Sequence, residues 1–133
     1  MPLLKNKTMI KTNSLTKIYG DKTALSIDQL EIPTGQSFGL VGNNGAGKTT
    51  FFSLLLDLIK ASSGEIISNK IAVAKSEEWK NFTSAFIDDS FLIGYLTPEE
   101  YFYFVGCLRG IDQKEVDLFL EAYADFFNDE ILN

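Results

Sequence analysis

A glycine-rich segment in the first half of the chain places the strongest constraint on its fold. Residues 42–49 read Gly-Asn-Asn-Gly-Ala-Gly-Lys-Thr and fit the pattern G-x-x-x-x-G-K-[ST]. Glycines in this pattern let the backbone wrap around an anion without a Cβ in the way, so that successive N–H groups point at it. The segment is therefore typical of a loop that binds the phosphates of a nucleoside triphosphate.

The end of the pattern and its flanks support the same interpretation. Lys48 would place an ammonium group near the β- and γ-phosphates, and Thr49 would offer its hydroxyl to Mg²⁺. A mostly apolar run at 37–41 predicts a buried strand before the loop, and residues 50–59, which lack Gly and Pro, predict a helix after it. The first turn of that helix would present unpaired N–H groups and its positive dipole end to the phosphates.

The composition narrows the class of protein. The 133 residues make one domain or part of one, and 45% hydrophobic residues are enough to build a core. Acidic residues outnumber basic ones 18 to 12, which argues against a nucleic-acid partner, because a polyanion needs a basic face. The absence of histidine excludes a Ser-His triad and a zinc-histidine site within the chain. The single cysteine, Cys107, allows no internal disulfide and is expected to be buried in a helix.

The sequence shows no secretory signal and no membrane span. The longest apolar stretch, residues 51–59, is interrupted by Ser53 and Asp57 and is too short to cross a bilayer. We expect a soluble cytoplasmic protein that reaches the inner face of a membrane only through a partner.

The residues ahead of the loop predict two antiparallel strands. Residues 8–15 alternate loosely, and the Gly-Asp pair within residues 17–22 marks a turn. The apolar positions within 24–32 predict a second strand, which Pro-Thr-Gly at 33–35 ends. These two strands would form a small β layer beside the main sheet. The strand at 37–41 would belong to the main sheet.

Turns, short strands and helices are predicted after the loop helix. A turn at 62–64 precedes a short strand at 65–67, and apolar runs at 71–74 and 83–87 favour further strands.

Helix-start signals mark the last third of the chain. Thr97 is placed as an N-cap, Pro98 as the first helical residue and Glu100 as the partner that completes a capping box. This helix is predicted to end at Arg109, before a glycine. A second helix is predicted to begin at Asp112, with Glu115 as the partner in its capping box.

Three stretches of the sequence resemble one family. Residues 15–20, 35–50 and 62–66 together make the chain similar to the N-terminal part of an ABC-type ATPase, the nucleotide-binding subunit of an ATP-driven membrane transporter. The resemblance implies an α/β P-loop NTPase with a β layer, a partial parallel sheet and the beginning of a helical subdomain. The ATP-binding core would extend over about residues 1–92 and the helical subdomain over about residues 93–133.

The resemblance also implies roles for single residues. Tyr19 would stack on the adenine ring; the alternative is that it fills the corner of the β layer. Thr50 would support the α-phosphate side, and Lys48 would take part in catalysis. The residues implied in nucleotide binding are Tyr19, Gly42, Asn43, Asn44, Gly45, Ala46, Gly47, Lys48, Thr49 and Thr50.

One position departs from the family pattern. Where the family places a glutamine that reaches Mg²⁺ and the attacking water, counting back from Thr97 gives Asp88. Asp88 could ligate Mg²⁺ as a hard oxygen donor and act in catalysis, but it would repel the γ-phosphate if the metal were absent. It could also be the acid at the end of a strand that binds Mg²⁺ in many phosphate-loop enzymes, or a solvated loop acid.

The later motifs of the family do not occur before Asn133, so the chain resembles roughly the first half of such a domain. Alone it is expected to bind nucleotide poorly and to turn over little ATP, if any. The resemblance implies ATP and Mg²⁺ as ligands, and as partners a second nucleotide-binding subunit and a membrane permease subunit. A small kinase and a nucleotide sensor without turnover remain alternatives. The aromatic block at 101–104 cannot all face one side of a helix, so it would either dock the membrane partner or pack in the core.

Overall fold

The computed structural model of the protein describes residues 7–125, with the side chain of Phe91 excepted. These residues fall into two compact units that meet between Ile87 and Asp88. Each unit is described by itself.

The first unit is built on a long hairpin. Strand β1 (Thr8–Tyr19) pairs antiparallel with β2 (Lys22–Pro33), and the two-residue turn between them contains Gly20 at φ 56°. The predicted pair of antiparallel strands is confirmed. Both strands continue further toward the turn than the sequence pattern suggested, because Gly20 and Asp21 close the hairpin by themselves.

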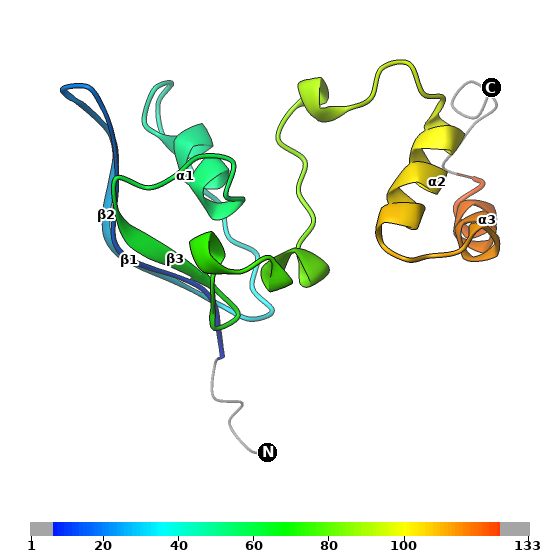
Figure 1. The fold of residues 1–133 in the computed structure, drawn as a ribbon, viewed down its shortest axis with the longest axis horizontal. Helices are drawn as coiled ribbons and strands as arrows, with labels where there is room; N and C mark the ends of the chain where they lie inside the picture. The colour runs from blue at the N-terminus through cyan, green and yellow to red at the C-terminus, as the bar shows by residue number, and fades with distance from the viewer. Residues whose placement is uncertain (1–6, 126–133) are drawn as a thin grey trace. The chain divides into compact units, whose positions relative to one another are not determined.

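Two later strands complete an antiparallel sheet. Strand β3 (Ser63–Ser68) pairs with β1 on the side opposite β2, and β4 (Ile71–Ala72) pairs with β3, which gives the order β2-β1-β3-β4 (Figure 1). The strand predicted at 65–67 is confirmed. The one predicted at 71–74 ends after two residues and turns into a 3₁₀ helix, η1 (Val73–Lys75).

Helix α1 (Lys48–Leu55) follows the glycine-rich loop and ends earlier than predicted. Asp57 takes a left-handed conformation at φ 54°, and the amides of Asp57 and Leu58 donate to the carbonyls of Leu54 and Ser53. This is the Schellman arrangement, which glycine usually provides. An aspartate in that position gives no stop signal in the sequence, so the helix was predicted to continue to residue 59.

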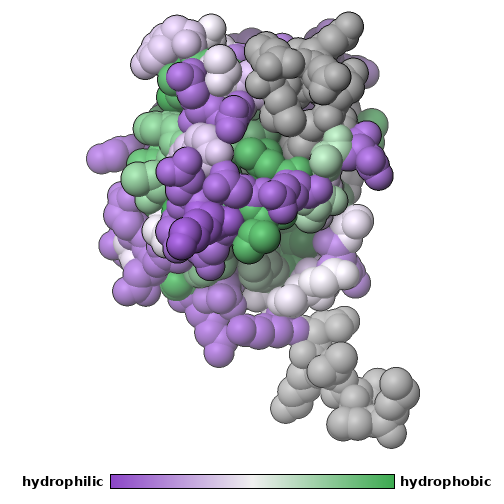
Figure 2. Space-filling view, turned by 90° about the vertical axis from the view of Figure 1, so that its right-hand side faces the viewer, coloured by the Kyte–Doolittle hydropathy of each residue, from purple (hydrophilic) through white to green (hydrophobic). Residues whose placement is uncertain are grey.

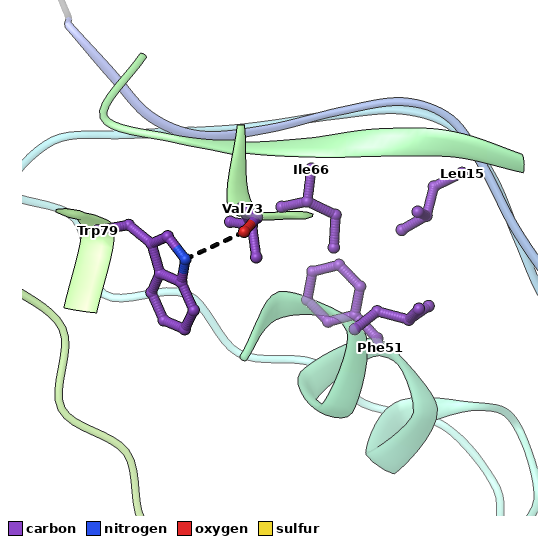
Figure 3. Packing of buried hydrophobic residues seen from close by; sticks show 6 residues of the cluster. Leu15, Phe51, Ile66, Val73 and Trp79 are labelled. Atoms are coloured by element: carbon purple, nitrogen blue, oxygen red, sulfur yellow. Dashed lines mark hydrogen bonds between the residues drawn. The ribbon is translucent and has the colours of Figure 1, made fainter. Parts of the chain in front are cut away.

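The core of this unit lies between the sheet and α1. Phe51 is 1% exposed and packs toward Leu15 of β1 and Ile66 of β3, with Val73 and Trp79 at one end of the cluster (Figure 3). Trp79 lies in the 3₁₀ helix η2 (Glu78–Phe82), and its indole Nε1 donates to the Val73 carbonyl oxygen at 3.2 Å, which satisfies the one polar group of the buried ring.

The predicted strands at 37–41 and 83–87 do not form in the described part of the chain. Val41 is 95% exposed, whereas a strand of a parallel sheet is normally buried on both faces. Neither segment has a partner strand among residues 7–125, and a strand without a partner leaves its backbone groups unpaired. Residues 7–125 therefore supply the antiparallel layer of the predicted fold, and the segments predicted as its parallel strands are extended without a partner.

An apolar cleft lies where these two segments approach α1. It has a volume of about 630 Å³. Leu40 and Phe86 line it from the two extended segments, and Phe52 and Leu55 line it from the helix. One face of α1 is thus packed on the sheet, while another face borders an open apolar space.

The second unit contains two helices. Helix α2 (Pro98–Leu108) and helix α3 (Gln113–Ala122) both begin with the capping boxes that the sequence predicted. The Thr97 hydroxyl accepts from the Glu100 amide at 3.2 Å, and the Glu100 carboxylate accepts from the Thr97 amide at 2.8 Å. A 3₁₀ helix, η3 (Asp89–Phe91), precedes them.

The two helices approach closely through a glycine. A Cβ at Gly106 would lie 2.6 Å from Cγ2 of Val116, so that only glycine allows this contact. The sequence predicted that residues 101–104 cannot all face one side of a helix. Phe104 of this block is exposed, in agreement with that prediction. Cys107 is also exposed, so the expectation that it is buried was wrong, although it does lie in a helix. Figure 2 shows hydrophobic residues (green) among hydrophilic ones (purple) on one face of the surface.

Candidate nucleotide-binding site

The glycine-rich loop has a backbone that only glycine fits at its closing residue. Gly47 is the N-cap of α1 and has φ 87°. A Cβ built there would lie 2.5 Å from the carbonyl oxygen of Ala24 and 3.1 Å from Cδ1 of Leu25. Gly45 also has a positive φ, 83°, but has open space around it. The loop therefore packs its backbone directly against β2, and this contact fixes where α1 starts.

The first turn of α1 presents amides that the helix itself does not use. The Phe51 amide makes the first i to i−4 bond, to the Gly47 carbonyl oxygen at 2.8 Å, so the amides of Lys48, Thr49 and Thr50 precede the hydrogen-bonded ladder. Gly47 has no side chain that could cap them. Three donors at the positive end of a helix are thus available to an anion.

Lys48 lies across its own loop. Its ammonium group donates to the carbonyl oxygens of Gly42 at 2.6 Å and of Asn43 at 2.8 Å, and the Ala46 amide closes a turn onto the Asn43 carbonyl at 3.1 Å. These bonds hold the two ends of the loop together. They also hold the positive charge of the ammonium group against the loop backbone.

These groups surround one cavity of about 330 Å³. This volume falls within the range of ligand sites in proteins. The residues that line it are Lys22, Ala24, Asn44, Gly45, Gly47, Lys48, Thr49 and Thr50. Three predicted loop residues do not line the cavity: Gly42, Asn43 and Ala46. The carbonyl oxygens of Gly42 and Asn43 accept from Lys48, and the Ala46 amide closes the turn onto Asn43.

Two lining residues were not predicted from the sequence. Lys22 and Ala24 come from the start of β2, some 20 residues before the loop. Lys22 directly follows the turn that Tyr19 precedes, and the strand register pairs the two residues. The sequence alone does not show that the hairpin end folds over the loop.

Tyr19 lies at the end of β1 and is 53% exposed, and it does not line the loop cavity. The Lys17 ammonium lies 4.7 Å from the centre of its ring and donates to the Lys60 carbonyl oxygen at 2.7 Å. The ring is thus steadied by a cation–π contact and still has open surface.

The predicted metal ligands differ in their surroundings. The Thr49 hydroxyl belongs to a residue of the cavity and fits Mg²⁺, a hard cation that is usually held by one or two protein oxygens, phosphates and water. Asp88 belongs to the second unit, where it caps η3. Its carboxylate accepts from the hydroxyl and, at 2.8 Å, from the amide of Ser90, which lowers the pKa of Asp88 below its ordinary value. No cluster of three or more acidic or cysteine side chains that could hold a metal by itself occurs in residues 7–125.

A loop of this sequence and geometry at the start of a helix that packs on a sheet is characteristic of a P-loop domain. The sequence matches the family described as "ABC transporter" over residues 25–132. The chain therefore belongs to the ABC transporter family.

The relatives and the solved structures are consistent with this. The chain is 35% identical over 138 residues to the retinal-specific phospholipid-transporting ATPase ABCA4 of Mus musculus, covering 90% of this chain and 6% of that protein. It is 39% identical over 94 residues to the ABC transporter ATP-binding protein YcbN of Bacillus subtilis, covering 69% and 30%. The dimeric structure of MJ0796, a bacterial ABC transporter cassette, superposes with a TM-score of 0.77 at 22% identity, covering 94% and 60%.

The last comparison confirms the fold of an ABC ATPase cassette. The chain spans less than two thirds of the length of each of these proteins. No helix within residues 7–125 is long and apolar enough to cross a membrane.

Proposed function

We propose that the chain binds MgATP as the N-terminal part of the nucleotide-binding domain of an ABC transporter. ATP binding and hydrolysis there would power transport across a membrane. The observation that carries the proposal is the cavity in which the first-turn amides of α1, the Lys48 ammonium and the Thr49 hydroxyl come together. A triphosphate tail is the ligand that matches several convergent amides, one cation and one metal-binding hydroxyl.

Each part of the loop has a separate task in this proposal. Gly42, Gly45 and Gly47 allow the backbone to approach the phosphates, with Asn43, Asn44 and Ala46 filling the turn between them. Lys48 exchanges its bonds to loop carbonyls for the β- and γ-phosphates, so its charge is already placed before ATP arrives. Thr50 supports the α-phosphate through its free amide.

The base would bind at Tyr19. Its half-exposed ring offers a π face to adenine, while Lys17 holds the ring from another direction. Stacking gives affinity with little discrimination among bases. The preference for ATP therefore rests on the family rather than on hydrogen bonds to the base in this chain.

Hydrolysis would be an in-line attack of water on the γ-phosphorus. Mg²⁺, when bound, would neutralise phosphate charge, and Thr49 would hold it. Asp88 is the candidate for the second metal oxygen and the water contact. Its bonds to Ser90 favour a second candidate function, a sensor that binds nucleotide and hydrolyses little, because they engage the carboxylate locally.

The relatives support the proposed partners and location. MJ0796 has a dimeric structure, and several relatives are described as transporters or as their ATP-binding proteins. We infer a second nucleotide-binding subunit, a membrane permease subunit and a cytoplasmic position beside the membrane through that permease. The ATP-binding core would end near residue 92 and the helical subdomain would follow.

Binding and turnover by the full-length protein test the proposal. Wild type should bind MgATP, and Lys48→Ala should weaken binding at least tenfold, since a charge-assisted bond to phosphate contributes more than about 1.4 kcal/mol. Lys75→Ala, an exposed lysine outside the loop cavity, is the control. Undiminished MgATP affinity in Lys48→Ala would contradict the proposal.

Hydrolysis assays separate the alternatives. A transporter ATPase should be stimulated by its membrane subunit, a sensor should bind ATP without releasing phosphate, and a kinase should need an acceptor. Phosphate release is measured with and without the membrane subunit in each case.

A further inference from the structure

A second lysine from outside the glycine-rich loop reaches the loop cavity. Lys22, the first residue of β2, lines the same cavity of about 330 Å³ as Lys48 and Thr49. The G-x-x-x-x-G-K-[ST] pattern does not include it. A cationic side chain at the wall of a site built for phosphate is a candidate binding group.

The two lysines differ in what they already bind. The Lys48 ammonium is engaged by two loop carbonyls. The Lys22 side chain makes no hydrogen bond, ion pair or cation–π contact within the described part of the chain, and the residue is exposed. The Lys22 ammonium can therefore turn to a ligand without giving up a protein contact.

The hairpin register shows where along a nucleotide this charge would fall. Lys22 pairs with Tyr19 across the turn, and residues paired across an antiparallel ladder project from the same face. Lys22 thus neighbours Tyr19, the proposed base site, and at the same time lines the phosphate cavity. A ligand that spans the two sites passes this residue where its base and sugar give way to its phosphates.

We propose that Lys22 binds the α-phosphate of the nucleotide. The inference rests on the proposed function, since it assumes a nucleotide with its base at Tyr19 and its outer phosphates in the loop. Lysine acts on phosphate as a mobile point charge, which suits a residue that approaches from a neighbouring strand. An α-phosphate contact is common to ATP and ADP, whereas Lys48 favours the outer phosphates.

The test compares nucleotide affinities in the full-length protein. Lys22→Gln removes the charge and keeps a similar length, and it should raise the Kd of both MgATP and MgADP about tenfold, by the same factor for each. Lys22→Arg should recover most of the affinity. The loss in Lys22→Gln should shrink at high salt, because the pair is exposed. Lys75→Gln is the matched control, and thermal unfolding verifies that each variant folds.

The measured affinities separate failure of the Lys22 assignment from failure of the proposed function. If Lys22→Gln binds both nucleotides as tightly as Lys75→Gln while Lys48→Ala does not, Lys22 is not a binding residue and the proposed function stands. A loss confined to MgATP would place Lys22 on the γ-phosphate and overturn the α-phosphate assignment. If wild type retains neither nucleotide, the proposed function and this inference both fail.

Discussion

Replacing Gly47 with alanine tests the loop geometry most directly. The residue has φ 87°, a conformation that costs a residue with a Cβ about 1–2 kcal/mol. The new Cβ would also lie 2.5 Å from the Ala24 carbonyl oxygen, a backbone atom that cannot swing away. Relieving a contact of this kind by a local shift costs about 1–2 kcal/mol more, near the lower end of overpacking costs. The loop conformation should lose about 2–4 kcal/mol in total.

This cost falls on phosphate binding more than on folding. Gly47 ends a loop that can relax outward while Phe51 remains buried between α1 and the sheet. The relaxed loop no longer aims the amides of Lys48, Thr49 and Thr50 at one point. We therefore expect the Kd for MgATP to rise by about 30- to 1000-fold, which is 2–4 kcal/mol expressed as an equilibrium constant.

Two further glycines divide this effect into its parts. Gly45 shares the positive φ, 83°, but has no atom within 4 Å of a new Cβ, so Gly45→Ala should lose only about 5- to 30-fold. Gly39 has open space and no positive φ, so Gly39→Ala should bind like wild type. Fluorescence titration with a labelled ATP measures all three. Equal affinities for Gly47→Ala and Gly39→Ala would refute the claim that this backbone forms the site.

Three further predictions concern contacts around the site and in the second unit. Lys17→Met should weaken MgATP binding only about two- to fivefold, the value of an exposed cation–π contact, whereas Lys60→Met, which keeps its backbone carbonyl, should have no effect. Gly106→Ala should lower the free energy of unfolding of the α2–α3 pair by about 1–3 kcal/mol, and by less where the higher helix propensity of alanine offsets the clash. Adding Val116→Ala to the same chain should restore the free energy of unfolding, which is measured by denaturant unfolding. The hydrogen bond to Asp117 raises the pKa of Tyr103 to about 12 from an ordinary 10, so stability that is present below pH 10 should be lost between pH 10 and 12; Tyr103→Phe should lack this alkaline step.

The sequence predicted the parts of the fold that depend on local chemistry. The capping boxes at Thr97 and Asp112 and the glycine turn at Gly20 each follow from residues within one turn of chain, and all three formed. The predicted end of α1 was wrong because Asp57 adopts a left-handed conformation, which is uncommon for a residue other than glycine.

Features that depend on distant residues were harder to predict. The apolar run at 37–41 has the composition of a buried strand, but strand formation needs a partner that residues 7–125 do not supply. Lys22 was missed for a related reason. Its role depends on the hairpin folding over a loop that begins 20 residues later, and no local pattern records that contact.

The two sides of α1 link the phosphate site to the rest of the domain. The side with Phe51 and Leu54 is packed on the sheet, and the side with Phe52 and Leu55 borders the apolar cleft of about 630 Å³, whose lining includes Lys48 and Thr49. Phosphate affinity requires the first-turn amides to hold fixed directions, so it depends on how rigidly this helix is held. Any segment that covers the cleft would therefore raise nucleotide affinity without touching the nucleotide, and in return nucleotide binding would stabilise that covered state by the same free energy.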